Sequence, residues 1–171
     1  MPIARSSAAA IRNALPGLVL RAHTINDVLL QLVKVLQPQI PGLCRLSVRR
    51  FLPQEGQLQL AAVWSASETR LRRGTRISAG ASSMPEVLKL DRPVFSAEAA
   101  SSDLTLLLQV LATEGIRSWV SIPLRRGRQV VGLLSVSSIQ PDAIDPTDSG
   151  FFEAIGKAVE ARVPQLEGWE P

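Results

Sequence analysis

Two apolar segments in the second half of the chain form the clearest pattern in the sequence. From Arg117 to Leu124, and again from Gln129 to Val136, β-branched and other apolar residues dominate, which is typical of strands. The short basic link between them contains Gly127, which can adopt the positive φ of a tight hairpin turn. Because the second segment is apolar on both faces, we expect a central strand with structure packed above and below the sheet.

Two earlier segments alternate polar and apolar residues and predict a second hairpin. Residues 43–52 are expected to form a half-buried strand, with Cys44, Leu46 and Val48 inward and Arg45, Ser47 and Arg49 on the other side. Residues 57–65 are expected to place four residues on one face: Leu58, Leu60, Ala62 and Trp64. Gly56 between the two segments completes the hairpin.

Helical spacing of apolar residues predicts the helices. The firmest prediction spans Ile25 to Gln37, with Thr24 as its cap, Asp27 three residues further on and Pro38 at its end. A second long helix follows Thr147 and ends at Pro164. Shorter helices are expected at residues 5–15, where Pro16 interrupts the pattern, at residues 82–90 and at residues 103–114.

These elements predict an α+β fold with a central antiparallel sheet of five to six strands. The first and last long helices are expected to cover one face, and short helices and loops to enclose a pocket on the other. The chain then divides into an N-terminal helical flank or connector at residues 1–23, one domain at residues 24–163 and a tail at residues 164–171.

Composition favours a single globular domain and adds few other constraints. The chain has 171 residues, 46% of them hydrophobic and 20% charged, which suits one domain with one sizeable core. No apolar run is long enough to span a membrane or to act as a secretory signal, so we expect a cytoplasmic protein. The single cysteine, Cys44, excludes an internal disulfide.

Seven arginines fall in two short segments, although the net charge is only +4. They lie in a predicted loop and in the hairpin turn: Arg70, Arg72, Arg73, Arg76, Arg125, Arg126 and Arg128. Contact with nucleic acid would need both segments on one face. No groove-reading helix motif is present, so solvated loops are favoured over nucleic-acid binding.

The order of segments resembles that of a known family. The run GIRSWVSIPLRRGRQVVGLLSVSS is followed by PDAIDPTDSGFFEAIGKAVEARV, and RRGTRISAG and MPEVLKLDRPVFSAEA lie upstream. Together, residues 24–163 are similar to a GAF domain, a small-molecule sensor module in which a strand, a turn and a strand precede the closing helix. The resemblance specifies the architecture and leaves the ligand and any cofactor unknown.

The resemblance implies a regulatory role. A non-catalytic module would bind a small molecule or form a homodimer, and would pass the signal to a partner or output domain such as a kinase or transcription regulator. The expected dimer contacts come from the two long helices: Leu29, Val33, Phe152 and Val159. Two alternatives stay open, a purely structural dimerisation module and a free methionine sulfoxide reductase. The reductase chemistry needs a second thiol to regenerate the first.

One face of the segment from Arg117 to Leu124 carries the candidate ligand residues. Alternation places Arg117, Trp119 and Ser121 together, where an arginine, a ring and a hydroxyl could hold a small planar or anionic molecule. Cys44 and Trp64 complete this hypothetical ligand set. The alternative is that Trp119 is a core residue and Arg117 reaches solvent. The lone histidine, His23, could be a haem ligand as in some relatives, but a structural or solvated role is favoured. No catalytic or metal-binding motif is present.

Overall fold

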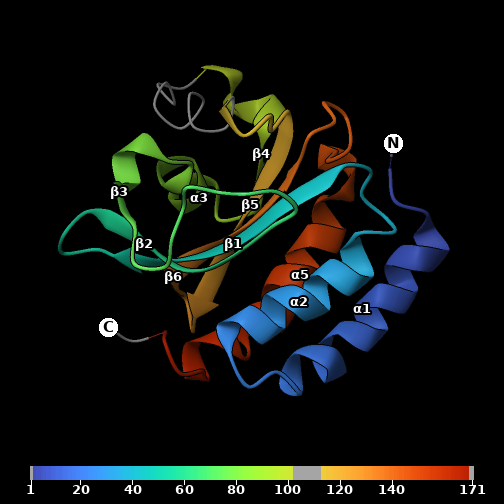
Figure 1. The fold of residues 1–171 in the computed structure, drawn as a ribbon, viewed down its shortest axis with the longest axis horizontal. Coiled ribbons are helices and arrows are strands. Elements are labelled where there is room, and N and C mark those ends of the chain that lie inside the picture. The colour runs from blue at the N-terminus through green and yellow to red at the C-terminus, as the bar shows by residue number, and fades with distance from the viewer. Residues whose placement is uncertain (1, 102–112, 170–171) are drawn as a thin grey trace.

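A six-stranded antiparallel sheet forms the centre of the molecule. The computed structural model describes residues 2–101 and 113–169, and its strands run in the spatial order β3, β2, β1, β6, β5, β4 (Figure 1). Their bounds are β1 (Leu43–Leu52), β2 (Gln57–Ser65), β3 (Arg76–Ser78), β4 (Val94–Phe95), β5 (Ser118–Arg126) and β6 (Gln129–Ser138). The predicted α+β fold with a central antiparallel sheet is confirmed. The helix predicted at residues 103–114 falls almost wholly outside the described residues.

Two helices cover one face of the sheet, α2 (Ile25–Leu36) and α5 (Ser149–Glu160), and α1 (Arg5–Leu20) packs against both of them on the side away from the strands (Figure 1). A short 3-10 turn, η3 (Pro146–Asp148), leads into α5. The predicted cap of α2 is confirmed, because Thr24 Oγ1 accepts from the backbone N–H of Asp27 and the Asp27 carboxylate accepts from that of Thr24. The apolar stripes of these helices and the facing side chains of the sheet make the main core. In the described part of the chain, no helix has the length and apolar character needed to cross a membrane.

Helix α1 differs from the prediction, because Pro16 does not interrupt it. The helix runs unbroken from Arg5 to Leu20 with Pro16 inside. Proline removes one backbone hydrogen bond and usually kinks a helix. Here Leu15 and Val19, on either side of Pro16, are almost fully buried in the main core, and this packing holds the segment helical. The N-terminal flank therefore contributes core residues, and the division expected at residue 23 stays a prediction.

Shorter elements cover the other face. They are η1 (Ala79–Ala81), α3 (Met84–Leu90) and η2 (Ser96–Ser101), which lie across the sheet from the long helices (Figure 1). Apolar residues from these elements and the sheet form a second, smaller core that includes Leu58, Met84, Val87, Val94 and Leu133. Beside this core the sheet face becomes polar, and a pocket lies there.

The C-terminal segment after α5 also packs against the domain. It contains a 3-10 turn, η4 (Val163–Gln165), and Glu167 forms an isolated bridge with Thr24. Leu166 and Trp169 are buried in the main core. The residues expected to be a tail thus hold large apolar side chains against the sheet.

Candidate functional site

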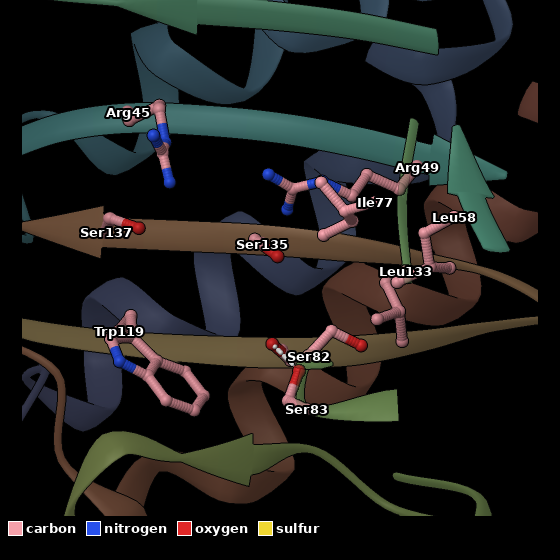
Figure 2. A pocket seen from close by; sticks show the side chains of 11 residues that line it. Arg45, Arg49, Leu58, Ile77, Ser82, Ser83, Trp119, Leu133, Ser135 and Ser137 are labelled. Atoms are coloured by element: carbon pink, nitrogen blue, oxygen red, sulfur yellow. Dashed lines mark hydrogen bonds between the residues drawn. The ribbon is translucent and has the colours of Figure 1, made fainter. Parts of the chain in front are cut away.

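The pocket lies between the polar face of the sheet and the segment that leads into α3. Figure 2 shows side chains from neighbouring strands converging on it, with Arg45 and Arg49 on β1, Ser135 and Ser137 on β6, and Trp119 on β5. Its full lining is Arg45, Arg49, Leu58, Ile77, Ser82, Ser83, Trp119, Ser121, Leu133, Ser135 and Ser137. The described lining is therefore two cations, one indole and several hydroxyls set among apolar residues.

Strand alternation places these groups on one face. In β1 the side chains of Leu46 and Val48 enter the main core beneath the helices, so Arg45 and Arg49 point to the opposite face. The alternation of polar and apolar residues predicted a half-buried strand. Because β1 pairs with β2 and β6 and is covered on both sides, it is instead buried on both faces, and both arginines are buried with it, 3% and 8% exposed.

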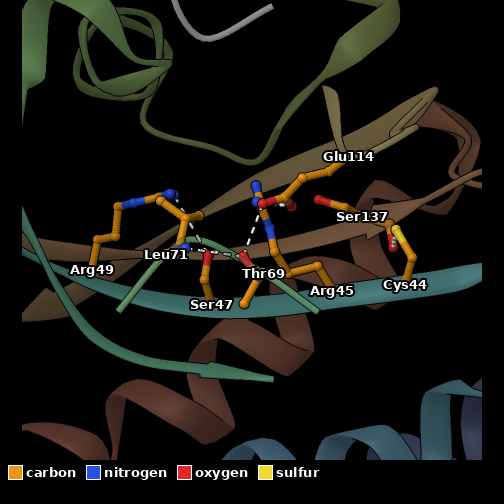
Figure 3. Close-up of polar contacts among 8 residues, drawn as sticks. All are labelled: Cys44, Arg45, Ser47, Arg49, Thr69, Leu71, Glu114 and Ser137. Atoms are coloured by element: carbon orange, nitrogen blue, oxygen red, sulfur yellow. Dashed lines mark hydrogen bonds and ion pairs between the residues drawn. The ribbon is translucent and has the colours of Figure 1, made fainter. Parts of the chain in front are cut away.

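Arg45 is held by a carboxylate that also contacts a neighbouring loop. Its Nη1 lies 2.5 Å from an oxygen of Glu114, whose other oxygen accepts a 2.8 Å hydrogen bond from the hydroxyl of Thr69 (Figure 3). The backbone N–H of Leu71 donates to the same hydroxyl. Nε of Arg45 is buried and has no hydrogen-bond partner among the described residues. The guanidinium thus keeps donor capacity in addition to its ion pair.

Arg49 has much weaker compensation for its charge. Its one hydrogen bond among the described residues runs from Nη1 to the hydroxyl of Ser47, at 3.5 Å (Figure 3), which is the long limit for such a bond. Removal from water, and secondarily the positive charge of Arg45, lower the pKa of Arg49 to about 10, partly offset by Glu114. The side chain therefore remains a cation at neutral pH in a place that penalises its charge.

The hydroxyls nearby are neutral and mostly engaged with one another or with backbone. The hydroxyl of Ser83 donates to that of Ser121 at 2.6 Å, and that of Ser82 donates to the Ala79 carbonyl. The free space inside the pocket is about 20 Å³, which is room for one or two waters. A larger guest requires lining side chains to move.

The structure brings together only part of the expected ligand set. Trp119 and Ser121 both line the pocket, as their alternation suggested. Arg117 precedes β5, is exposed, and borders a different hollow with Ser96 and Asp142. Trp119 is therefore both a buried residue and a wall of the pocket.

Cys44 and Trp64 do not line the pocket. Cys44 is the unpaired residue of a bulge in β1, is half-buried, and donates its thiol to the Ser137 carbonyl. A second bulge leaves Ala61 of β2 without a partner in β1, which reverses the alternation beyond it. Leu58 consequently faces the pocket while Trp64 packs against the main core on the opposite face. The expected grouping of Trp64 with Leu58 is wrong for this reason.

The four helix residues expected at a dimer interface lie in the chain's own core. Leu29, Val33, Phe152 and Val159 are all buried beneath the helical layer. Side chains so placed have no surface to offer a second subunit. A contact through α1 and α2 would have to use their exposed apolar residues, among which are Leu20 and Leu30, 63% and 48% exposed.

A model of the GAF domain family matches residues 22–161. The chain belongs to this family. The match includes all six strands, the α3 segment and the pocket between them. No curated protein matches the sequence of this GAF domain.

Solved structures share the GAF fold. A free methionine-R-sulfoxide reductase from Neisseria meningitidis, solved with its substrate, gives a TM-score of 0.70 at 16% identity over 99% of this chain and 95% of that one. The GAF domain of a sensor histidine kinase from Bacillus halodurans gives 0.64 at 19% identity over 88% and 100%. The chromophore-binding domain of a bacteriophytochrome from R. palustris gives 0.69 at 12% identity over 99% and 65%; the chain spans less than two thirds of its length. Such identities establish the fold alone.

The buried arginines Arg45 and Arg49 were not predicted as site residues from the sequence. A signal for them was available: Arg45, Ser47 and Arg49 share one strand face, and Ser135 and Ser137 share another. Placing the segment at residues 129–136 at the centre of the sheet, with β1 beside it, would have put these polar residues together under cover. No metal-binding cluster of three or more His, Cys, Asp or Glu side chains occurs within residues 2–101 and 113–169.

Proposed function

We propose that this GAF domain is a non-catalytic regulatory module that binds a small molecule in the pocket lined by Arg45, Arg49 and Trp119. Occupancy would shift a conformational equilibrium that is passed to a partner or to an output domain such as a kinase or transcription regulator. The observation that carries the proposal is a covered pocket whose buried polar groups are incompletely paired within the described part of the chain. Buried donors without partners cost free energy, and a ligand can supply the missing contacts.

The described lining favours binding over turnover. A serine becomes a nucleophile only beside a base, whereas the lining of the pocket contains no histidine, carboxylate or thiol among the described residues. His23 is exposed in the connection between α1 and α2. The thiol of Cys44 faces a backbone carbonyl, and burial raises its pKa, which disfavours the reactive thiolate. A reductase would also need a second thiol, and the chain has one cysteine.

We also propose that the domain forms a homodimer through its helical layer. The supporting observation is the exposure of Leu20 on α1 and Leu30 on α2. Analytical ultracentrifugation of Leu30→Asp should give a monomer where the wild type is a dimer. A wild-type monomer at high concentration would refute this proposal without touching the ligand proposal.

Native mass spectrometry of the protein purified from its own host tests ligand binding directly. We expect an adduct that disappears on unfolding and is absent from Ser135→Leu, in which a larger side chain fills the pocket. Ser6→Leu, the same change on the exposed face of α1, should keep the adduct. Binding should also change the fluorescence of Trp119, compared with Trp119→Phe. The absence of any adduct, together with no saturable response to a metabolite panel, would refute the proposal.

A further inference from the structure

The charges that the described residues place around the pocket do not balance. Arg45 and Arg49 are both more than nine-tenths buried, and the one carboxylate that contacts either of them, within residues 2–101 and 113–169, is Glu114 on Arg45. Counted over the described residues, the pocket therefore holds about one uncompensated positive charge. A buried charge without a counter-charge costs several kcal/mol in general, and proteins normally pair it or bind an ion beside it.

The geometry of the donors suits an oxygen-bearing anion. Arg45 and Arg49 are four residues apart on one strand, and Figure 2 shows both guanidinium groups directed over the same stretch of sheet face. A planar guanidinium donates pairs of parallel hydrogen bonds to carboxylates and phosphates. The hydroxyls of Ser135 and Ser137 lie on the adjacent strand and line the same space, and a hydroxyl can donate to an anion without adding charge.

We propose that the pocket binds an oxyanion, a carboxylate or an inorganic oxyanion, between Arg49 and Arg45, and that this anion competes with Glu114 for Arg45. The inference rests on the proposed function and adds the chemical class of its ligand. The free space in the pocket is room for one or two waters, so an anionic group of a few atoms enters only when lining side chains move. A neutral or cationic ligand would leave Arg49 unpaired and would gain none of this compensation.

Competition with Glu114 supplies the link between occupancy and structure. Glu114 joins Arg45 to Thr69, and Thr69 also receives the backbone N–H of Leu71 (Figure 3). An oxyanion on Arg45 weakens the Arg45–Glu114 pair, so the contact between the Thr69 loop and the segment before β5 loses its anchor on the sheet. The anion thus has different affinities for the joined and separated arrangements, which is the requirement for a ligand to shift an equilibrium.

Titration with simple anions tests the inference. Sodium formate, acetate, phosphate and sulfate are added separately at constant ionic strength, with sodium chloride as the balancing salt, while the melting temperature and tryptophan fluorescence are followed. We expect saturable stabilisation by at least one oxyanion and none by chloride alone. The response to carboxylates compared with that to phosphate and sulfate tells which kind of oxyanion fits. No saturable response to any of the four would overturn the inference.

Variants separate the pocket from general charge effects. Arg49→Met should abolish the response, and Arg49→Lys, which keeps the charge without the planar fork, should weaken it by roughly tenfold. Arg128→Gln removes an equal charge from the exposed hairpin turn and should change nothing. Equal affinity in Arg49→Lys, Arg128→Gln and wild type would overturn the inference even if Arg49→Met fails to fold.

Glu114→Gln gives the sharpest test, because tighter oxyanion binding is expected in this variant. Removing the internal competitor should tighten oxyanion binding by about tenfold or more, since charge-assisted contacts to Arg45 become free. A purely structural Arg45–Glu114 pair would lower stability without raising anion affinity, and that outcome would overturn the competition. Native mass spectrometry distinguishes the two proposals: a neutral or cationic adduct that Ser135→Leu removes would overturn the oxyanion and keep the sensor function.

Discussion

Replacing Gly132 with alanine should loosen the centre of the sheet. Gly132 lies in β6, where it is paired with both β1 and β5. A Cβ at this position would fall 2.4 Å from the carbonyl oxygen of Arg49 and 2.7 Å from the ring of Trp169. Ordinary carbon–oxygen contacts across a sheet are about 3.3–3.6 Å, so β1 and β6 must separate by roughly 1 Å. The ring of Trp169 can turn aside, but the Arg49 carbonyl is fixed in the backbone.

The expected loss of stability is large for the addition of one methyl group. Overpacking a core typically costs about 1–3 kcal/mol, and we expect about 3 kcal/mol because the obstacle is backbone. With a urea m-value of about 2 kcal/mol per M, the unfolding midpoint should fall by about 1.5 M. Because the Arg49 backbone is displaced, the same variant should also bind any pocket ligand more weakly.

Gly17→Ala is the matched control. Gly17 lies exposed in α1 and has nothing within 4 Å of the position of an added Cβ. Alanine in a helix interior is favoured over glycine by about 0.5–1 kcal/mol, so the midpoint should rise. Equilibrium urea unfolding followed by circular dichroism measures both variants. A midpoint for Gly132→Ala within about 0.3 M of the wild type would refute the proposed close approach.

Other substitutions test the helical layer and the buried polar groups. Gly156→Ala should lower the free energy of unfolding in urea by about 1–2 kcal/mol, because its Cβ would lie 2.5 Å from Ile122. The loss should be smaller in an Ile122→Ala background, and equal losses in the two backgrounds would contradict the contact. Thr24→Ala removes the cap of α2 and should lower the free energy of unfolding, measured in the same way, by about 1 kcal/mol. Burial raises the pKa of Cys44, so alkylation should titrate at higher pH in the folded protein than in urea. Arg49→Met should raise the stability of the unliganded domain by about 1–3 kcal/mol; a lower melting temperature would contradict it.

Local periodicity was sufficient to predict much of the fold. The alternation in β5 placed Trp119 and Ser121 on one face, and the helical spacing with the Thr24 cap located α2. These features depend on neighbouring residues only, because strand and helix periods are set by backbone geometry. The centrality of β6 followed from its apolar character, since a strand without a polar face needs cover on both sides.

The remaining differences arise from contacts between distant segments. The bulge at Ala61 reverses the side of the sheet that Trp64 faces, and no residue type in β2 predicts a bulge there. Pro16 stays helical because Leu15 and Val19 pack against the rest of the core, which the local sequence cannot report. Arg49 looked solvent-facing because alternation of charge with apolar residues is typical of an open sheet face, whereas burial depends on what the rest of the chain lays across it.

The polar face of β1 bears on function because it does not help the domain fold. The helical layer and the main core bury one side of the sheet. On the other side, apolar residues in place of Arg45 and Arg49 would enlarge the second core. Well-packed apolar replacements of buried charges are commonly neutral or stabilising. The pKa of Arg49, lowered to about 10, corresponds to a penalty on the order of 3 kcal/mol on its charged form. An anion beside Arg49 relieves that penalty, so the same feature that weakens the empty domain strengthens the occupied one. Arg49→Met should therefore raise the stability of the domain and lower its affinity for the anion, whereas Gly132→Ala should lower both.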